Sequence, residues 1–418
     1  MPSAVNDAPS AQATLAPPAT IKEVQGLVLS GGGAHAAYEI GVIKALLNGQ
    51  SSSTRYLPLE IDIISGTSAG SVNACLLMSE LDQAPSSAIS YLEDTWLDDI
   101  ADGPNRCGSG AFRIRANPFS FTDLACYSSN PAGPFIRFTQ DSVFLARNLL
   151  ARGVNFFAGT RSLSQRTLEL VDISMLVSND PLQKIIRKKV RFDRIRSSRR
   201  MLRIATTNWS KGEVRVFSNS DMTDEKGTSV IMGSSAIPGI YPWVEIEGEQ
   251  YCDGGVIMNT PLKPAVDAGA SQLHVIYMNP DASRIPLPPI PNTLDDVARA
   301  LTIGFGATVN KDIQTAEGVN EAIDFLKGGR ALKDVARRDI STVLLAAAGE
   351  LRARKSEVSH RTLEVHRYHP DSALEVGMLS FDRAGLRRLI ERGYEDGVGH
   401  DCVKNKCLLA KPIARAPQ

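Results

Sequence analysis

The feature that most constrains the fold is the stretch ISGTSAG at residues 64–70. The β-branched run before it, residues 59–64, predicts a strand, and the apolar run after it, residues 71–80, predicts a helix. A strand that turns sharply into a helix strains the turn residue, and only small neighbours tolerate that conformation. Because Gly66 and Gly70 flank Ser68, we expect the Ser68 hydroxyl at a helix N-terminus, where a nucleophile is favoured.

A glycine cluster follows the first predicted strand, which covers residues 24–29. Gly31, Gly32 and Gly33 come directly before an amphipathic helix that we expect at residues 34–47. Glycines let backbone N–H groups approach a developing negative charge without obstruction by side chains. The cluster therefore predicts an oxyanion hole.

The glycine cluster also satisfies the dinucleotide fingerprint G-x-G-x-x-G/A, with Ala36 at its last position. A Rossmann unit needs an acidic residue about 20 positions later, at the end of the second strand. Here Glu60 and Asp62 lie near the start of that strand, and the strand ends in the serine turn instead. The sequence therefore disfavours a nucleotide site, and we expect no cofactor.

The chain opens with strands and helices in alternation, which predicts a mainly parallel sheet with helices on both faces. Further strands are expected at residues 202–207, 213–217, 243–246 and 273–278. We expect a single domain over residues 23–412, preceded by a disordered Ala-, Pro- and Ser-rich tail, residues 1–22. Helices should dominate residues 293–412, although a strand-like run at 362–368 indicates a return to the same sheet.

Residues 101–160 have a different character, because aromatic side chains are crowded there among Gly, Pro and Ser. They are Phe112, Phe119, Phe121, Tyr127, Phe135, Phe138, Phe144, Phe156 and Phe157. An excursion of this kind between two sheet strands can form a lid or a wall for an acyl chain, or an ordinary satellite core. Composition favours neither a lid or acyl-chain wall nor a satellite core over the other.

A third motif, YCDGG, places Asp253 before Gly254 and Gly255. Taken together in this order, SGGGAHAAYEIGV from residue 30, GTSAG from residue 66 and YCDGG resemble the patatin-like phospholipase family. The resemblance covers roughly residues 24–280. It implies a three-layer α/β/α fold with a mainly parallel central sheet, and an enzyme that cleaves lipid acyl esters with a serine–aspartate dyad and no histidine.

Carried over onto this sequence, the resemblance makes Ser68 the nucleophile and Asp253 the proton acceptor. The N–H groups of Gly31 to Gly33 would form the oxyanion hole, and no metal is implied. The chain departs from the family at His35-Ala36, where Arg-Gly is usual. Contacts that the arginine makes are therefore in question, and His35 is a candidate to replace them as a hydrogen-bond donor.

Two other functions compete with this interpretation. An α/β-hydrolase would use serine, an acid and a histidine, but His274 lies in a strand that we expect to be buried. The other candidates lie late in the chain with no motif around them, namely His360, His366, His369 and His400. That fold also places strands before the oxyanion loop, whereas only the one strand expected at residues 24–29 precedes Ser30 here. A catalytically silent lipid-binding or interaction protein is the other alternative, and it should have lost Ser68 or Asp253, both of which are present.

The charge pattern bears on partners other than a lipid ester. With 46 basic and 46 acidic residues, no global field attracts nucleic acid or an anionic membrane. A basic run at residues 184–203 could contact anionic lipid head groups, but a solvated helix face is the commoner explanation for such a run. Nucleic-acid binding is disfavoured, because no aromatic residues are interleaved with the basic ones in the way that such binding needs. Peripheral membrane contact could use this run or residues 101–160.

The location of the chain is predicted from what the sequence lacks. The tail has neither the basic start nor the apolar block of a secretory signal, and no apolar run approaches the roughly 20 residues of a membrane span. The six cysteines are scattered without CxxC spacing, which is typical of reduced thiols and indicates no metal site. We expect a cytoplasmic protein, or one peripheral at a membrane.

Overall fold

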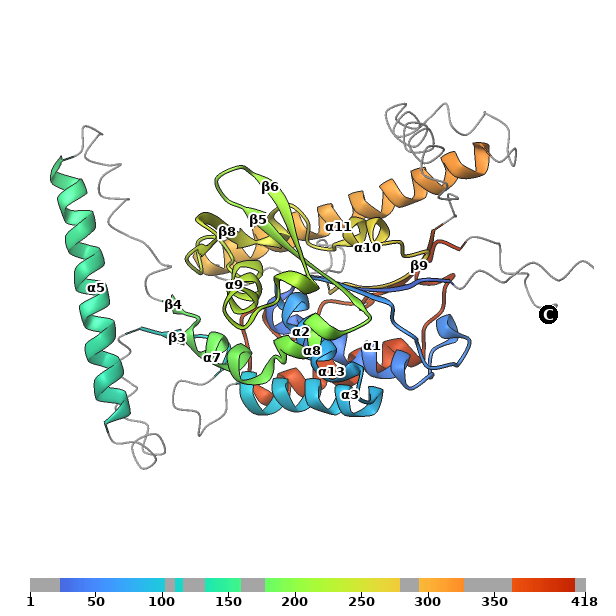
Figure 1. The fold of residues 1–418 in the computed structure, drawn as a ribbon, viewed down its shortest axis with the longest axis horizontal. Coiled ribbons are helices and arrows are strands. Elements are labelled where there is room, and N and C mark those ends of the chain that lie inside the picture. The colour runs from blue at the N-terminus through green and yellow to red at the C-terminus, as the bar shows by residue number, and fades with distance from the viewer. Residues whose placement is uncertain are drawn as a thin grey trace, which may run out of the picture.

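The computed structural model describes residues 23–101, 110–115, 132–158, 177–278, 293–326 and 363–409. The tail expected at residues 1–22 lies outside these ranges. The centre of the molecule is an eight-stranded sheet with the order β10-β9-β1-β2-β5-β8-β7, in which β6 also pairs with β5 (Figure 1).

Five neighbouring strands of this sheet run parallel and the rest antiparallel. The parallel strands are β1 (Gln25–Leu29), β2 (Ile63–Thr67), β5 (Met201–Asn208), β9 (Gln272–Ile276) and β10 (Glu364–Tyr368). The antiparallel strands are β6 (Glu213–Ser218), β7 (Val244–Ile246) and β8 (Glu249–Asp253). A separate short pair joins β3 (Arg113–Ile114) to β4 (Val177–Ser178). The expected mainly parallel sheet is confirmed.

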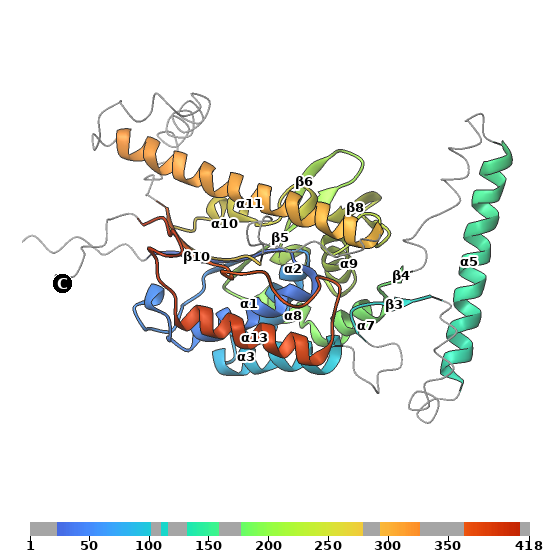
Figure 2. The same cartoon turned by 180° about the vertical axis from the view of Figure 1, so that it is seen from behind.

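Helices cover both faces of the sheet, which makes a three-layer α/β/α fold (Figure 1, Figure 2). One layer contains α1 (Ala37–Leu47), α2 (Ala69–Leu81), α3 (Pro85–Asp94) and α13 (Arg383–Val398). The other contains α10 (Leu262–Asp267) and α11 (Thr293–Leu326). Three further helices, α7 (Asp180–Lys189), α8 (Phe192–Ser197) and α9 (Asp224–Ser234), lie towards the antiparallel side.

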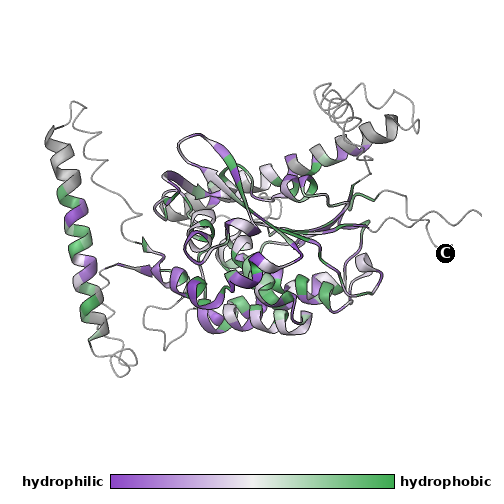
Figure 3. Ribbon diagram, viewed as in Figure 1, coloured by the Kyte–Doolittle hydropathy of each residue, from purple (hydrophilic) through white to green (hydrophobic). Residues whose placement is uncertain are grey.

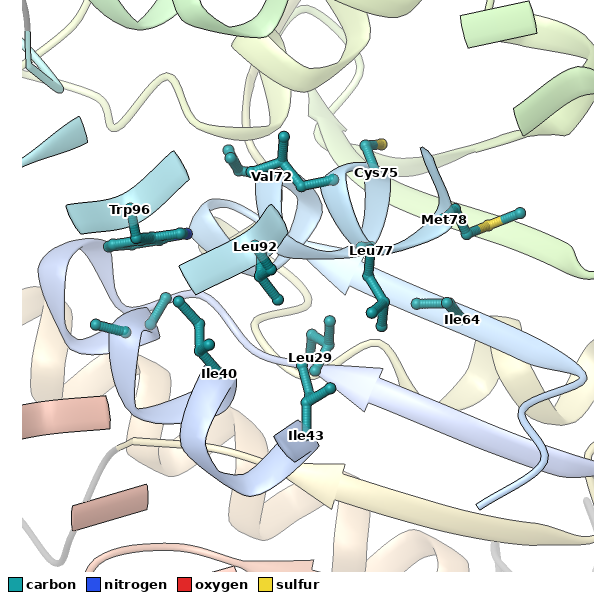
Figure 4. Close-up of a cluster of buried hydrophobic side chains, with 14 of the residues drawn as sticks. Leu29, Ile40, Ile43, Ile64, Val72, Cys75, Leu77, Met78, Leu92 and Trp96 are labelled. Atoms are coloured by element: carbon teal, nitrogen blue, oxygen red, sulfur yellow. The ribbon is translucent and has the colours of Figure 1, made fainter. Parts of the chain in front are cut away.

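The side chains of β1 explain why the sheet is buried on both faces. Leu27 and Leu29 join the cluster of buried residues beneath α1 and α2, whereas Val28 joins the cluster beneath α10 and α11. Successive side chains of a strand point to opposite faces, so a continuous apolar run requires cover on both. Figure 4 shows part of the first cluster, in which Leu29 faces Ile43 of α1.

Each expected strand is present, and its ends lie within three residues of those expected, except at the start of β2. The strand expected at residues 59–64 is wrong in its start, because Asp62 instead caps β1: its carboxylate accepts a hydrogen bond from the Gln25 N–H at 3.0 Å. The return to the sheet is confirmed, since β10 pairs in parallel with β9. The helix expected at residues 34–47 begins as a 3-10 turn, Gly33–Ala36, and continues as α1.

Helix α5 (Gly133–Ala158) stands apart from the three layers in both views (Figure 1, Figure 2). It carries exposed apolar side chains, among them Phe135 at 67% and Leu150 at 70% exposure. Figure 3 shows hydrophobic and hydrophilic residues alternating along it. Of the nine aromatic residues noted above, Phe119, Phe121 and Tyr127 lie outside the described residues. Among the described residues, no helix is both long and apolar enough to cross a membrane.

Candidate active site

Ser68 lies at the sharp turn between β2 and α2, as the sequence predicts. Its φ is 54° and its ψ is −128°, a conformation that side chains rarely adopt. A Cβ on Gly66 would lie 2.5 Å from the Gly70 carbonyl oxygen, and a Cβ on Gly70 would lie 2.5 Å from that of Leu29. The strained turn can therefore form only because both flanking residues lack side chains.

Asp253 ends β8 and contacts Ser68 directly. The Ser68 hydroxyl donates a hydrogen bond to Oδ2 of Asp253 at 2.6 Å, while Oδ1 accepts one from the Gly255 N–H at 2.7 Å. Ser68 is 5% exposed and Asp253 is 1% exposed. Burial raises the pKa of Asp253 to about 7, although the bonds from Ser68 and Gly255 oppose this rise.

The glycine cluster lies beside Ser68, and its three N–H groups differ in whether they have a hydrogen-bond acceptor. The N–H of Gly31 donates to the backbone carbonyl of Asn259 at 3.1 Å, and Asn259 Nδ2 donates back to the Gly31 carbonyl at 3.2 Å. The N–H groups of Gly32 and Gly33 meet no acceptor within the described part of the chain. Gly31 thus differs from the expectation, because its N–H is already engaged in holding the loop.

Ser234, at the end of α9, supports the turn and was not singled out from the sequence. Its Oγ accepts a hydrogen bond from the Ser68 N–H at 2.9 Å and donates one to the Ala205 carbonyl at 2.8 Å. It thereby ties the nucleophile turn to β5. The segment GSSAIP at residues 233–238 contains this serine. Its bonding partner lies 166 positions away in sequence, so the residues around Ser234 do not reveal the bond.

His35 contacts the C-terminal part of the chain. Its Nε2 lies 2.5 Å from the Val376 carbonyl oxygen, and burial lowers the pKa of the imidazole. The neighbouring Ala34 N–H donates to the Met378 carbonyl at 2.8 Å. Where the family usually has arginine, this chain therefore has a neutral side chain that anchors residues 376–378 over the glycine cluster.

A mainly apolar pocket opens beside Ser68. Its lining comes from Gly33, Ser68, Ala69, Val72, Trp96, Ile100, Ala111, Leu182, Ser235, Ile237, Tyr241, Leu379 and Phe381. The ring of Phe381 contacts those of Trp96 and Phe112, with centroids 6.4 and 6.0 Å apart. Residues 101–160 therefore contribute to the pocket wall through Ala111, whereas Phe135 and Phe144 on α5 are exposed to solvent.

A family model described as patatin-like phospholipase matches residues 27–266, which is more than half of the chain. The chain belongs to the patatin-like phospholipase family. Among solved structures, it is similar to VipD from Legionella pneumophila at 15% sequence identity and a TM-score of 0.35, over 90% of this chain and 66% of that chain. No curated protein matches it in sequence.

The family is described as one of phospholipases, which are lipid acyl hydrolases. The matched residues include Gly31 to Gly33, Ser68 and Asp253. They do not include Leu379 and Phe381, which line the same pocket from beyond the match. One wall of the pocket therefore comes from the part of the chain that follows the matched residues.

The basic run at residues 184–203 lies mainly on α7 and α8. Half of its ten basic side chains form ion pairs: Lys188 and Lys189 with Asp99, Arg194 with Glu80, Arg196 with Asp224, and Arg200 with Asp82. Such pairs favour a solvated helix face over a free cationic surface.

A second group of chemically active side chains lies away from the pocket. It consists of His366, His400, Cys402 and Cys407, which could hold a metal ion. This contrasts with the expectation from the scattered cysteines. The group was not predicted from the sequence, because His366 belongs to a strand and the other three residues belong to a segment that begins 34 positions later.

Proposed function

We propose that this protein hydrolyses carboxylic ester bonds of lipids, with Ser68 as the nucleophile and Asp253 as the proton acceptor. The observation that carries the proposal is the 2.6 Å hydrogen bond between the Ser68 hydroxyl and the Asp253 carboxylate at a buried, strained turn. A serine hydroxyl is a weak nucleophile at neutral pH and needs a base within hydrogen-bond reach.

The reaction proceeds in two halves. Ser68 Oγ attacks the ester carbonyl carbon as its proton moves to Asp253, and the protonated Asp253 then gives that proton to the departing alcohol. Water next attacks the acyl-serine, loses a proton to Asp253, and the returning proton restores the Ser68 hydroxyl as the fatty acid leaves. A carboxyl group with a pKa near 7 suits both directions of transfer at neutral pH.

The N–H groups of Gly32 and Gly33 would stabilise the negative oxygen of each tetrahedral intermediate. They support this assignment because both are without a bonding partner among the described residues, and Gly33 lines the pocket together with Ser68. Pre-oriented donors at a developing charge are usually the largest electrostatic contribution to acyl transfer.

The apolar lining of the pocket fits the acyl chain of a lipid, with Trp96, Val72 and Phe381 as its walls. Contact with a membrane surface would supply such a substrate. The exposed Phe135, Leu149 and Leu150 on α5 favour that helix for the contact over the basic run, half of whose basic side chains are ion-paired.

A fluorophosphonate probe tests the proposal, because it forms a stable adduct only with an activated serine. We expect one adduct, on Ser68, and none in Ser68→Ala, which should also lose ester hydrolysis. The matched control is Ser65→Ala, which removes another buried hydroxyl of β2, one that donates to the Pro261 carbonyl. An unlabelled, folded protein would instead favour a silent lipid-binding protein.

A further inference from the structure

Four side chains that could bind a metal ion lie together at the edge strand β10. His366 lies in the middle of β10, His400 follows α13, and Cys402 and Cys407 belong to the segment after it. One ligand atom from each lies within 4.8 Å of every other. Two imidazoles and two thiols form one of the usual ligand sets of structural zinc sites.

The spacing of these atoms fits a tetrahedral ion. Cys402 Sγ lies 3.4 Å from His366 Nδ1 and 3.5 Å from His400 Nε2, and Cys407 Sγ lies 3.4 Å from the same His400 nitrogen. Zinc at about 2.3 Å from sulfur and about 2.0 Å from nitrogen sets such pairs about 3.5 Å apart. We propose that His366, His400, Cys402 and Cys407 bind one Zn²⁺ ion.

The surroundings hold the ligands in place without an ion. His366 and His400 are 4% and 5% exposed, and the Nε2 of His366 lies 2.8 Å from the side-chain amide of Gln272. The Cys407 sulfur accepts a hydrogen bond from the Arg367 N–H at 3.4 Å. A partner on the second nitrogen of a histidine orients its ring towards the metal.

Zinc here would be structural rather than catalytic. Four protein ligands complete a tetrahedral shell and leave no position for water or substrate. The ion would fasten the segment after α13 to β10, beside the backbone pairing of Val365 with Leu408. A disulfide between Cys402 and Cys407 is the competing explanation, but it would give the two imidazoles no role.

Metal titration of the full chain, stripped by a chelator and kept reduced, tests the site. We expect one equivalent of Zn²⁺ to bind and to raise the melting temperature by several degrees. Cobalt(II) in its place should give thiolate charge-transfer absorption and the intense visible bands of a tetrahedral site. Failure to bind either ion would overturn the proposal, and so would a Cys402–Cys407 disulfide that remains after treatment with a reductant.

Variants separate this site from the ester-hydrolysing one. Cys402→Ser and Cys407→Ser should each lose the cobalt charge-transfer signal and most of the zinc, whereas Cys75→Ser, at a free cysteine of α2 outside the group, should keep both. Hydrolysis of a soluble ester by the stripped protein, assayed well below its melting temperature, should not change. A stripped protein that stays folded but loses turnover would contradict a structural role, and full zinc binding by Cys402→Ser would contradict the ligand set.

Discussion

Asp253 of β8 pairs with Thr206 of β5. The preceding residue of β5, Ala205, pairs with Thr67 of β2. Strand β6 pairs with the other edge of β5 along both stretches. Strands β2 and β8 therefore share one edge of β5 and approach each other end to end. This arrangement brings Ser68, the residue after Thr67, to Asp253 across 185 positions of sequence.

Replacing the carboxylate tests the proton acceptor. Asp253→Asn keeps the size of the side chain and the bond from Gly255 but removes the basic oxygen, so kcat should fall by at least about a hundredfold. Steady-state kinetics with a soluble ester measures the loss, and circular dichroism checks the fold. Turnover near the parent rate in a folded variant would exclude Asp253 as the base.

The raised pKa of Asp253 predicts how activity depends on pH. The ionised carboxylate is the form that accepts a proton, so kcat/KM should rise with pH and level off above a midpoint at about 7. A profile of kcat/KM against pH measures this midpoint. A midpoint near the ordinary carboxyl value would show that burial does not govern this group.

The same pKa predicts a change in stability. Between the ordinary value of 3.8 and about 7, folded Asp253 holds a proton that the unfolded chain releases, so its contribution to stability is lost as pH rises through that window. Asp253→Asn cannot titrate. Its melting temperature relative to the parent should therefore increase from about pH 4 to about pH 8, and a constant difference would contradict the assignment.

Gly33 and Gly212 form a matched pair for testing the glycine cluster. Both have positive φ, 57° and 65°, but a Cβ on Gly33 would lie 2.4 Å from the Met378 carbonyl oxygen, whereas a Cβ on Gly212 meets nothing within 4 Å. Gly212→Ala should cost about 1 kcal/mol of unfolding free energy and leave turnover intact. Gly33→Ala should cost at least about 1 kcal/mol more and reduce turnover strongly. Denaturant melts and kinetics compare them, and equal effects would contradict the close contact.

The bond of His35 to Val376 predicts that this imidazole takes no part in the chemistry. His35→Gln can keep a hydrogen-bond donor there, so kcat should stay close to that of the parent. A hundredfold loss in a folded variant would revive an α/β-hydrolase mechanism.

Phe381 should influence which acyl chains are accepted. Phe381→Leu enlarges the pocket next to Trp96 and Phe112, so the ratio of kcat/KM for long-chain over short-chain esters should change by several-fold. A series of esters of increasing acyl length measures the ratio. An unchanged ratio would place the acyl chain elsewhere.

Local patterns predicted the parts of the site that depend on neighbouring residues. The turn at Ser68 and the parallel strands around it follow from apolar runs and glycines within a few positions. Strand β8 was missed, although Gly248, with φ of 79°, and Glu247, with φ of 56°, form the two-residue turn that joins it to β7. The Glu-Gly pair is the signal that could have revealed this hairpin.

Contacts across the sheet could not be predicted in the same way. The bond of Ser234 to Ser68, the engagement of the Gly31 N–H by Asn259, and the cover supplied by Met378 each join residues far apart in sequence. Their partners are set by strand order, and no periodicity or spacing encodes that order.

The hydrogen bond from Ala34 to the Met378 carbonyl has a consequence for protein synthesis. A ribosome delivers the chain from its N-terminus, and segments fold as they emerge. Ser68 and Asp253 are made well before Met378, Leu379 and Phe381, so a nascent chain lacks one wall of the pocket until these three residues have been added. A nascent chain that stops short of residue 378 therefore leaves the glycine cluster without the cover that the Ala34–Met378 bond holds in place.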